Sequence, residues 1–260
     1  PALVLSRFKP VHVLKNKFVS SPQSRRAYVR KTLTIAQFVI AQFFIIATLV
    51  VGKLIRFGHN KDMGFRKEAI INFTTPSMAN AGNKKFDLQA KVNAIPGVQQ
   101  VSLAGSPPAS NGHANTTMKH IKDGKEIETT VEIKYADTNY FRLYQMKLLA
   151  GRFLQHSDTA REYVVNEQYA RFLGYRNPAD IIGKTITRDK GAVPVVGVIA
   201  NIHTKSVHSA IDPLVYTTWS VFNKQFHIVL ASGGKNTDGW KKTIAQIEDA
   251  WKEVYPEEEF

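Results

Sequence analysis

Residues 32–52 contain no Lys, Arg, Asp or Glu, and this apolar stretch constrains the chain more than any other feature. Its sequence is TLTIAQFVIAQFFIIATLVVG. At about 1.5 Å of rise per residue, a helix of about 20 residues crosses the hydrocarbon core of a bilayer, which is about 30 Å thick. The stretch therefore predicts one membrane-spanning helix, which we place at residues 32–56.

Two other kinds of segment can contain a long apolar stretch. A buried helix of a soluble domain is usually shorter and amphipathic, whereas this stretch is apolar on almost every face. A cleaved signal peptide has a shorter apolar region, and here residues 1–31 precede it. Both alternatives are disfavoured, so the segments on either side of the helix are expected in different compartments.

Gln37 and Gln42 are the largest polar side chains of the apolar stretch. Amide groups facing lipid would lack hydrogen-bond partners, so the two glutamines are candidates for packing against other membrane helices. The alternative is that a single amide is tolerated near a membrane interface.

The basic residues predict the orientation of the helix. The net charge is +14, yet no Asp or Glu occurs before Asp62. An excess of Lys and Arg marks the cytoplasmic side of a span, so residues 1–31 are expected in the cytoplasm and residues 57–260 outside it. Because most of the excess charge lies beside the membrane, it indicates anionic lipid as a partner and not nucleic acid. The basic residues in question are Arg7, Lys9, Lys15, Lys17, Arg25, Arg26, Arg30 and Lys31 before the stretch, and Lys53, Arg56 and Lys61 after it.

Residues 57–260 show the alternation expected of an α+β domain. A strand at 69–74, a helix from about Asn83 and a strand at 98–104 form a first βαβ-like unit. A second βαβ-like stretch begins with a short strand at 162–165, followed by Asn166 as a helix N-cap and Gly174 as the helix end. Further strands are expected at 184–188, 193–202, 214–219 and 227–232, and a last helix from about Asp238.

A β-rich insert is predicted between the two halves, at residues 105–160. Its clearest element is a hairpin around Asp123-Gly124, a dipeptide preferred in two-residue type I′ turns. A short helix capped by Asp137 or Thr138 follows, and its aromatic residues are expected to pack in the core. The predicted fold class is thus α+β, with one transmembrane helix and an outer domain of two βαβ-like halves around this insert.

No catalytic or metal-binding motif is found. Gly183-Lys184-Thr185 has the end of a phosphate-binding loop, but Pro178 occupies the position of its first glycine. The chain has no cysteine, which excludes thiol nucleophiles and thiolate metal sites. The eight histidines lack metal-ligand spacing, so we predict neither an enzyme nor a bound cofactor or metal.

Many short motifs, in order along nearly the whole chain, resemble the FtsX-like and MacB-like permeases of ABC transporters. The start of the apolar helix resembles their R-K-x-L-x-x-x-Q-F pattern, with Gln37-Phe38 in the matching place, and HNKDMGF resembles the segment that leads into their outer domain. LLAGRF, YVVNEQY, DIIGKTI and VVGVIANIH resemble later landmarks of that domain. One departure is Asn201-Ile202, where many relatives carry an acidic residue and then Phe.

The resemblance implies a porter-like domain outside the bacterial inner membrane. It also implies that ATP binds to a separate nucleotide-binding subunit, that the permease works as a dimer, and that the outer domain contacts an extracytoplasmic protein. The start at Pro1 predicts an internal segment of a longer chain. The basic N-terminal segment would then lie where the ATPase subunit docks, with an ordinary linker as the alternative. Its candidate docking residues are Phe8, Pro10, Val13 and Leu14.

The function implied is export of a peptide, lipid-linked or drug-like substrate, driven by that ATPase. One alternative is a membrane-anchored sensor whose outer domain binds a ligand and signals to a kinase. Another is a permease-family regulator of cell-wall hydrolases, which differs from a transporter only in its extracytoplasmic partner.

Overall fold

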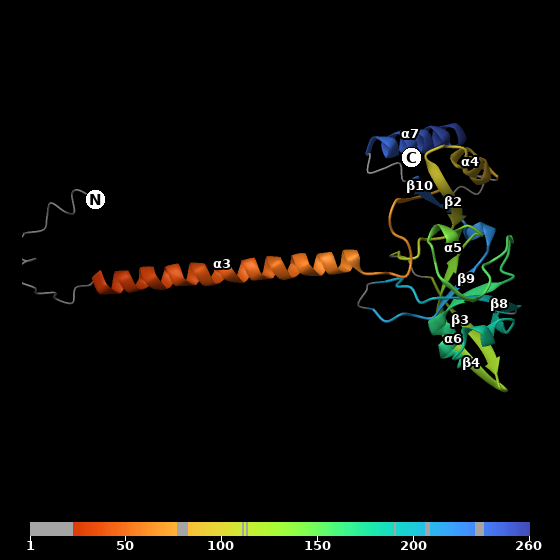
Figure 1. Cartoon of the computed structure of the whole chain (residues 1–260), viewed down its shortest axis with the longest axis horizontal. Helices are drawn as coiled ribbons and strands as arrows, with labels where there is room; N and C mark the ends of the chain where they lie inside the picture. Colours follow the sequence, from red (N-terminus) through yellow and green to blue (C-terminus); the bar gives the residue numbers. More distant parts are fainter. Residues whose placement is uncertain are drawn as a thin grey trace, which may run out of the picture. The chain divides into compact units, whose positions relative to one another are not determined.

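The fold comes from a computed structural model, which describes residues 23–76, 83–110, 112, 114–189, 191–205, 209–231 and 237–260. The predicted docking residues Phe8, Pro10, Val13 and Leu14 lie outside these ranges. The chain divides into two compact units, Pro1–Lys61 and Asp62–Phe260, and each is described by itself (Figure 1).

The first unit contains one helix, α3 (Gln23–Asn60), of 38 residues. Within this helix, Ala27–Gly58 is long and apolar enough to cross a membrane. This range includes the predicted span at 32–56. The hydroxyl groups of Thr34 and Thr48 donate to the carbonyl oxygens of Arg30 and Phe44, at 3.0 and 2.8 Å. These threonines satisfy their polar groups inside the helix, as a lipid environment requires.

The second unit contains two sheets, of which the small sheet has the strand order β1-β10-β2. Both outer strands, β1 (Ile70–Thr74) and β2 (Val98–Ala104), run antiparallel to the central β10 (Gln225–Leu230). The helices α4 (Lys84–Asn93) and α7 (Thr237–Val254) contribute to the core of this sheet. Trp251 of α7 is buried there with Phe226 and Ile228 of β10.

The large sheet has the order β5-β8-β6-β9-β4-β3-β7, and β8 also pairs with β7, so the sheet closes on itself. The helix α6 (Glu167–Phe172) packs its Tyr169 and Ala170 into the core of this sheet. A single turn of helix, α5 (Tyr140–Leu143), follows β4 and contacts β2 and β10 of the small sheet. The strands are β3 (Asn115–Lys122), β4 (Lys125–Tyr135), β5 (Leu148–Gly151), β6 (Tyr163–Asn166), β7 (Thr185–Arg188), β8 (Gly191–Ile199) and β9 (Leu214–Thr217).

Local predictions agree well with the structure. Asp123 and Gly124 have φ values of 50° and 76°, the pair of positive values that a type I′ turn requires. The side chain of Asn166 accepts a hydrogen bond from the backbone N–H of Tyr169 at 3.0 Å and caps α6, as predicted. The strand predicted at 162–165 is β6 (Tyr163–Asn166), and the last helix, predicted from about Asp238, is α7 (Thr237–Val254).

The α+β class is confirmed, but the strands are grouped differently from the predicted halves. The strands of the second βαβ-like stretch share the large sheet with the hairpin of the predicted insert at 105–160. The partner that completes the small sheet is instead β10, which follows the whole large sheet in sequence. The large sheet as a whole is therefore inserted between β2 and β10.

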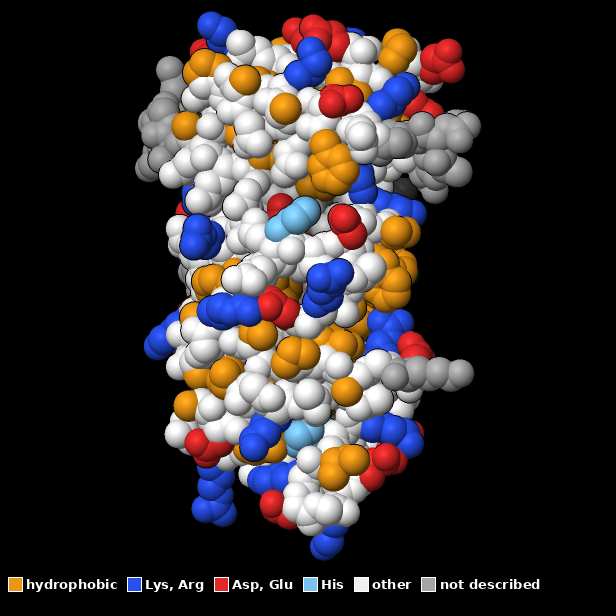
Figure 2. Space-filling model, turned by 90° about the vertical axis from the view of Figure 1, so that its right-hand side faces the viewer, with side chains coloured by type: hydrophobic (Ala, Val, Ile, Leu, Met, Phe, Trp, Pro, Cys, Tyr) orange, Lys and Arg blue, Asp and Glu red, His pale blue; other side chains and the backbone are white. Residues whose placement is uncertain are grey.

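Figure 2 shows one face of the molecule in space-filling form. Lys and Arg side chains lie interspersed with Asp and Glu side chains on this face, and apolar side chains lie scattered among them. Mixed charges of this kind produce no extended field of one sign.

Candidate functional site

Residues 62–66, here called the entry segment, connect α3 to the first strand of the domain. The backbone N–H of Arg66 donates to the carbonyl oxygen of Tyr144 at 2.7 Å, and the carbonyl oxygen of Met63 accepts from the N–H of His203 at 3.0 Å. The segment is thereby fastened to two places that are far apart in sequence. One is the residue that ends α5, and the other is the loop that follows β8.

Gly64 lets the entry segment approach this loop closely. Its φ is +82°, and a Cβ at this position would lie 2.7 Å from the carbonyl oxygen of Asn201 and 3.0 Å from Cγ2 of Ile202. The side chain of Asp62 accepts from the N–H of Gly64 at 2.8 Å and holds the turn. An L-residue is disfavoured here both by the backbone conformation and by the contact.

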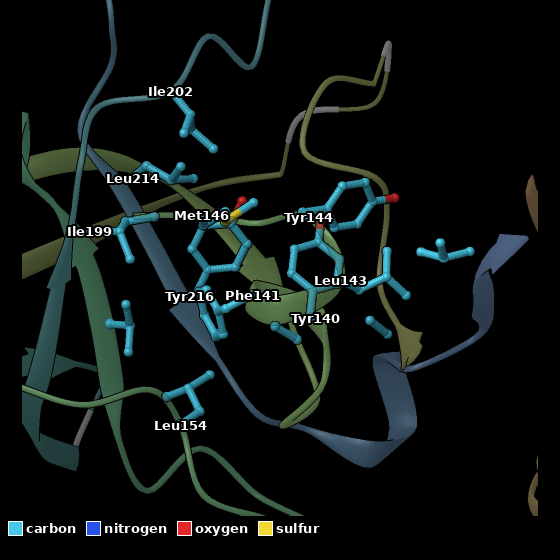
Figure 3. Packing of buried hydrophobic residues seen from close by; sticks show 14 residues of the cluster. Tyr140, Phe141, Leu143, Tyr144, Met146, Leu154, Ile199, Ile202, Leu214 and Tyr216 are labelled. Atoms are coloured by element: carbon cyan, nitrogen blue, oxygen red, sulfur yellow. The ribbon is translucent and has the colours of Figure 1, made fainter. Parts of the chain in front are cut away.

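The entry segment also packs on the buried cluster between the two sheets. The rings of Phe65 and Tyr144 meet edge to face, with centroids 6.0 Å apart. Tyr144 belongs to a cluster that combines α5 with residues of both sheets, including Tyr216 of β9 and Val229 of β10 (Figure 3). We call this cluster the joint. Its other buried members are Ala104, Ala136, Tyr140, Phe141, Leu143, Met146, Leu154, Val164, Ile199, Ile202 and Leu214.

A buried histidine connects the joint to the small sheet. Nδ1 of His227 lies 2.8 Å from the Tyr144 hydroxyl, and Nε2 lies 2.8 Å from the carbonyl oxygen of Gly105. Burial lowers the pKa of His227 to about 4, so the ring is neutral near pH 7. Because a carbonyl only accepts, Nε2 of the neutral ring carries the proton and donates to Gly105. The unprotonated Nδ1 faces both the Tyr144 hydroxyl and, at 2.7 Å, the side-chain amide of Asn72.

The start of α5 is fixed to β2 by one carboxylate. Asp137 accepts from the Ser102 hydroxyl at 2.6 Å, from the N–H of Leu103 at 2.9 Å, and from the N–H groups of Asn139 and Tyr140 at 3.0 and 2.9 Å. Burial raises the pKa of Asp137, and these hydrogen bonds oppose that rise. The N-cap residue is Asn139 and not the predicted Asp137 or Thr138, but the Asp137 carboxylate still accepts from the N–H groups at the start of α5 and ties them to the small sheet.

A buried ion pair anchors the loop after β8 to the large sheet. Nζ of Lys134 lies 3.2 Å from a carboxylate oxygen of Glu132, and both side chains are 2% exposed. The Thr204 hydroxyl donates to the other Glu132 oxygen at 2.8 Å, and Lys134 donates to the carbonyl oxygen of Pro107 at 3.1 Å. Burial lowers the pKa of Lys134, and the charge of Glu132 opposes this. Thr204 lies one residue beyond His203, which holds the entry segment.

The predicted helix-packing residues Gln37 and Gln42 are both exposed on α3. Neither has a hydrogen-bond partner among the residues that the structure describes. They are five positions apart, which separates them by about 140° around a helix, so they do not share one narrow face. Packing of these glutamines against other helices stays a prediction.

The described residues contain no group of three or more His, Cys, Asp or Glu side chains that could hold a metal ion. His120 is held by the carbonyl oxygen of Thr185 at 2.8 Å and the Tyr175 hydroxyl at 2.9 Å. His203 uses its backbone N–H to hold the entry segment, and His208 lies outside the described residues.

Sequence reasoning missed the roles of Gly64, Tyr144 and His227. A weak signal was present for the first, because Asp62 two residues before a glycine is typical of an Asx turn. At Asn201, where the sequence departs from the resembled pattern, the side chain accepts from the N–H of Gln168 at the start of α6, at 2.8 Å.

The sequence matches the MacB-like periplasmic core domain family over residues 32–247. Among solved structures, the extracellular domain of the ABC-type transporter YknZ from Gram-positive bacteria is similar, with 14% identity, a TM-score of 0.48, and coverage of 73% of this chain and 96% of that one. The periplasmic region of MacB from Actinobacillus actinomycetemcomitans is similar with 14% identity and a TM-score of 0.49, covering 74% and 86%. A comparison with curated proteins gave no significant match.

The matched region runs from the apolar part of α3 through the entry segment and both sheets into α7. A periplasmic core domain that follows a helix of membrane-spanning length indicates a membrane-anchored protein with an extracytoplasmic domain. The chain therefore belongs to the family of MacB-like periplasmic core domains of ABC transporter permeases.

Proposed function

We propose that this chain passes movements of a membrane helix, driven by a separate ATPase subunit, to an extracytoplasmic domain for the export of a substrate. The main support for this proposal is that the entry segment docks on the joint. The chain passes from α3 into the domain through residues 62–66, so a displacement of the helix acts on the domain through them.

A flexible linker would absorb such a displacement, whereas the entry segment is fixed on both sides. Two backbone hydrogen bonds hold it, to Tyr144 and His203, and Gly64 lies in close contact with Asn201. Close-packed interiors transmit small shifts because they have no free volume in which to absorb them. The segment thus acts as a rigid coupling element.

The two attachment points lead to different sheets. Tyr144 bonds to His227 of the small sheet, while the loop of His203 continues to Thr204 and the Glu132 carboxylate of the large sheet. A movement of the entry segment therefore acts on both sheets, with α5 between them. We expect the angle between the sheets to change during the transport cycle.

The remaining parts of the proposal concern partners. The nucleotide-binding subunit binds the ATP and docks near Phe8, Pro10, Val13 and Leu14, in the bacterial inner membrane. A second permease copy packs against the membrane helices, where Gln37 and Gln42 are candidate contacts. This chain has no catalytic role of its own, and its substrate is a peptide, a lipid-linked molecule or a drug-like molecule.

Co-purification tests this function. The parent protein is expressed with the products of its neighbouring genes and purified in mild detergent. We expect a stoichiometric ATP-binding subunit whose hydrolysis rate changes when the permease is present. Recovery of a kinase or another signalling protein, with no ATPase, would instead assign the outer domain to a sensor.

Cysteine labelling tests the orientation independently, because the chain has no cysteine. Tyr28 on the N-terminal side of the apolar stretch and Lys125 in the hairpin are both exposed. A membrane-impermeant maleimide should label Lys125→Cys in cells whose outer membrane is permeabilised, and should label Tyr28→Cys only after the inner membrane is opened. The reverse pattern would refute an extracytoplasmic domain.

A further inference from the structure

A cavity of about 240 Å³ lies between the two sheets, and the contacts that hold the entry segment do not use it. On the side of the small sheet it is lined by α4 and β2. On the side of the large sheet it is lined by the connection between β5 and β6 and by the chain that follows β9. Two of its lining side chains, Phe86 and His156, are exposed, so a solute can reach this inter-sheet cavity from solvent.

Asn223 gives the inter-sheet cavity a buried amide without a partner. Its side chain is 7% exposed, and its Oδ1 atom has no hydrogen-bond partner among the residues that the structure describes. A buried acceptor that bonds to nothing lowers the stability of the fold, and native proteins contain few of them. The position of Asn223 on the wall of a cavity indicates that its partner is a molecule in that cavity.

Lys85 of α4 supplies a cation to the same cavity. Its Nζ donates to the carbonyl oxygens of Ser220 and Asn223, at 2.7 and 3.3 Å. An ammonium group has three N–H donors, so one donor is left over. Burial lowers the pKa of Lys85, and the charge of Lys224 lowers it further, while the charge of Asp158 opposes this. A carboxylate bound in the cavity would take the third donor and offset the burial of the charge.

Asp137 supplies the opposite charge. Its Oδ1 accepts three of the four hydrogen bonds described above, whereas its Oδ2 accepts only one, from the N–H of Leu103. Because a carboxylate oxygen has two lone pairs, Oδ2 can accept one more donor.

We propose that the inter-sheet cavity binds a small zwitterion, with its ammonium group on Asp137 and Asn223 and its carboxylate on Lys85. One water molecule takes up about 30 Å³, so the cavity has room for about eight of them. A free amino acid and a dipeptide both have this size and this chemistry. The site involves only the second unit of the chain, so the proposal is independent of the ATPase and of the transport coupling.

Ligand-detected NMR on the purified full chain in detergent tests this site with four probes. L-alanine and L-alanyl-L-alanine are the zwitterions, and ethylamine and propionate each carry one of the two charged groups. We expect at least one zwitterion to bind, with a Kd in the millimolar range or below, as is usual for ligands of so few atoms. Ethylamine and propionate should each bind about tenfold more weakly or less. The zwitterion that binds more tightly shows whether the site takes a free amino acid or a dipeptide.

Variants separate binding from folding. Asn223→Leu keeps the size of the side chain and removes the unpartnered amide, so it should weaken binding of the zwitterion about tenfold while the Tm stays equal or rises. Asn93→Leu makes the same change at an exposed position of α4 that does not line the cavity, and should leave binding unchanged. Lys85→Met should weaken binding of the zwitterion and of propionate, but not of ethylamine. A merely structural role of Lys85 would not distinguish these probes.

Three results would overturn the proposal. The first is that neither zwitterion binds to the unaltered chain, which would show that the cavity holds only water. The second is that ethylamine or propionate binds as tightly as the zwitterions, which would show a site for a single charge. The third is that Asn223→Leu binds the zwitterion as tightly as the unaltered chain, or that Asn93→Leu loses as much affinity as Asn223→Leu. None of these results bears on the proposed transport function, because the measurements use no ATPase.

Discussion

Replacement of Gly64 by Ala tests whether the entry segment is held as tightly as its contacts indicate. The substitution has two costs. An L-residue in the left-handed conformation costs about 1–2 kcal/mol, and the added Cβ would lie 2.7 Å from the carbonyl oxygen of Asn201. Relieving an overlap with backbone typically costs about 1–3 kcal/mol more. These costs add to about 2–5 kcal/mol, and the restriction of the unfolded chain by Ala offsets about 0.4–1 kcal/mol, so we expect Gly64→Ala to lose about 2–4 kcal/mol of stability at this attachment.

Gly124→Ala is the matched control. Gly124 has a φ of +76°, close to that of Gly64, but a Cβ there would meet nothing within 4 Å. Its cost is the conformational one alone, reduced by about 0.4–1 kcal/mol because Ala restricts the unfolded chain. We expect a loss of about 1 kcal/mol, so the difference between the two variants measures the contact with Asn201.

Two assays report the result. Denaturant unfolding of the full chain in detergent can be followed by fluorescence, because all three tryptophans lie in the second unit. Hydrogen exchange follows the attachment itself, since the N–H groups of Arg66 and His203 are the two that hold the segment. In Gly64→Ala these amides should exchange more than tenfold faster, while Gly124→Ala should leave them unchanged. The close docking of the entry segment is refuted if the two variants lose equal stability and if the two amides exchange as slowly in both variants as in the unaltered chain.

Two further predictions concern the buried polar groups of the domain. The pKa of His227 is about 4 in the folded chain, whereas the pKa of an ordinary histidine is 6.5. The unfolded state therefore binds the proton more readily, and the free energy of unfolding falls as the pH drops from about 6.5 to about 4, by about 3 kcal/mol in all. Unfolding midpoints measured from pH 7 to about pH 4 should lose this part of the acid sensitivity in His227→Gln, and an unchanged pH profile would contradict a neutral buried ring. Lys134→Met removes the cation that lies 3.2 Å from the buried Glu132 carboxylate and should cost about 3–5 kcal/mol of unfolding free energy, most of which the double variant with Glu132→Leu should recover. Equal stability of the single and double variants would show that the pair is not coupled.

Elements defined by local chemistry could be predicted from the sequence. The apolar stretch predicted α3, Asp123-Gly124 predicted the hairpin turn, and Asn166 predicted the start of α6. In each case the signal is contained within a few consecutive residues. Such signals depend on backbone preference or on hydrogen bonds to neighbouring residues, and the rest of the fold does not override them here.

The pairing of distant segments could not be predicted in this way. His227 lies far along the chain from Tyr144 and Gly105, and no local pattern shows that β10 returns to complete the small sheet. A histidine on a strand can be exposed or buried, and which of the two occurs depends on the residues that pack around it in the tertiary structure. Likewise, the aromatic residue Tyr144 was expected to pack in the core, but its hydroxyl bond and its contact with the entry segment depend on tertiary structure.

Movement of the membrane helix is proposed to reach the domain through residues 62–66. The most direct test is hydrogen exchange measured by mass spectrometry on the assembled permease and ATPase, with and without a trapped ATP state. We expect nucleotide to change exchange in the entry segment and in the described part of the loop after β8, at residues 200–205, but not at the hairpin tip around Asp123 and Gly124. Identical exchange of the entry segment in both states, in a complex that hydrolyses ATP, would contradict the account.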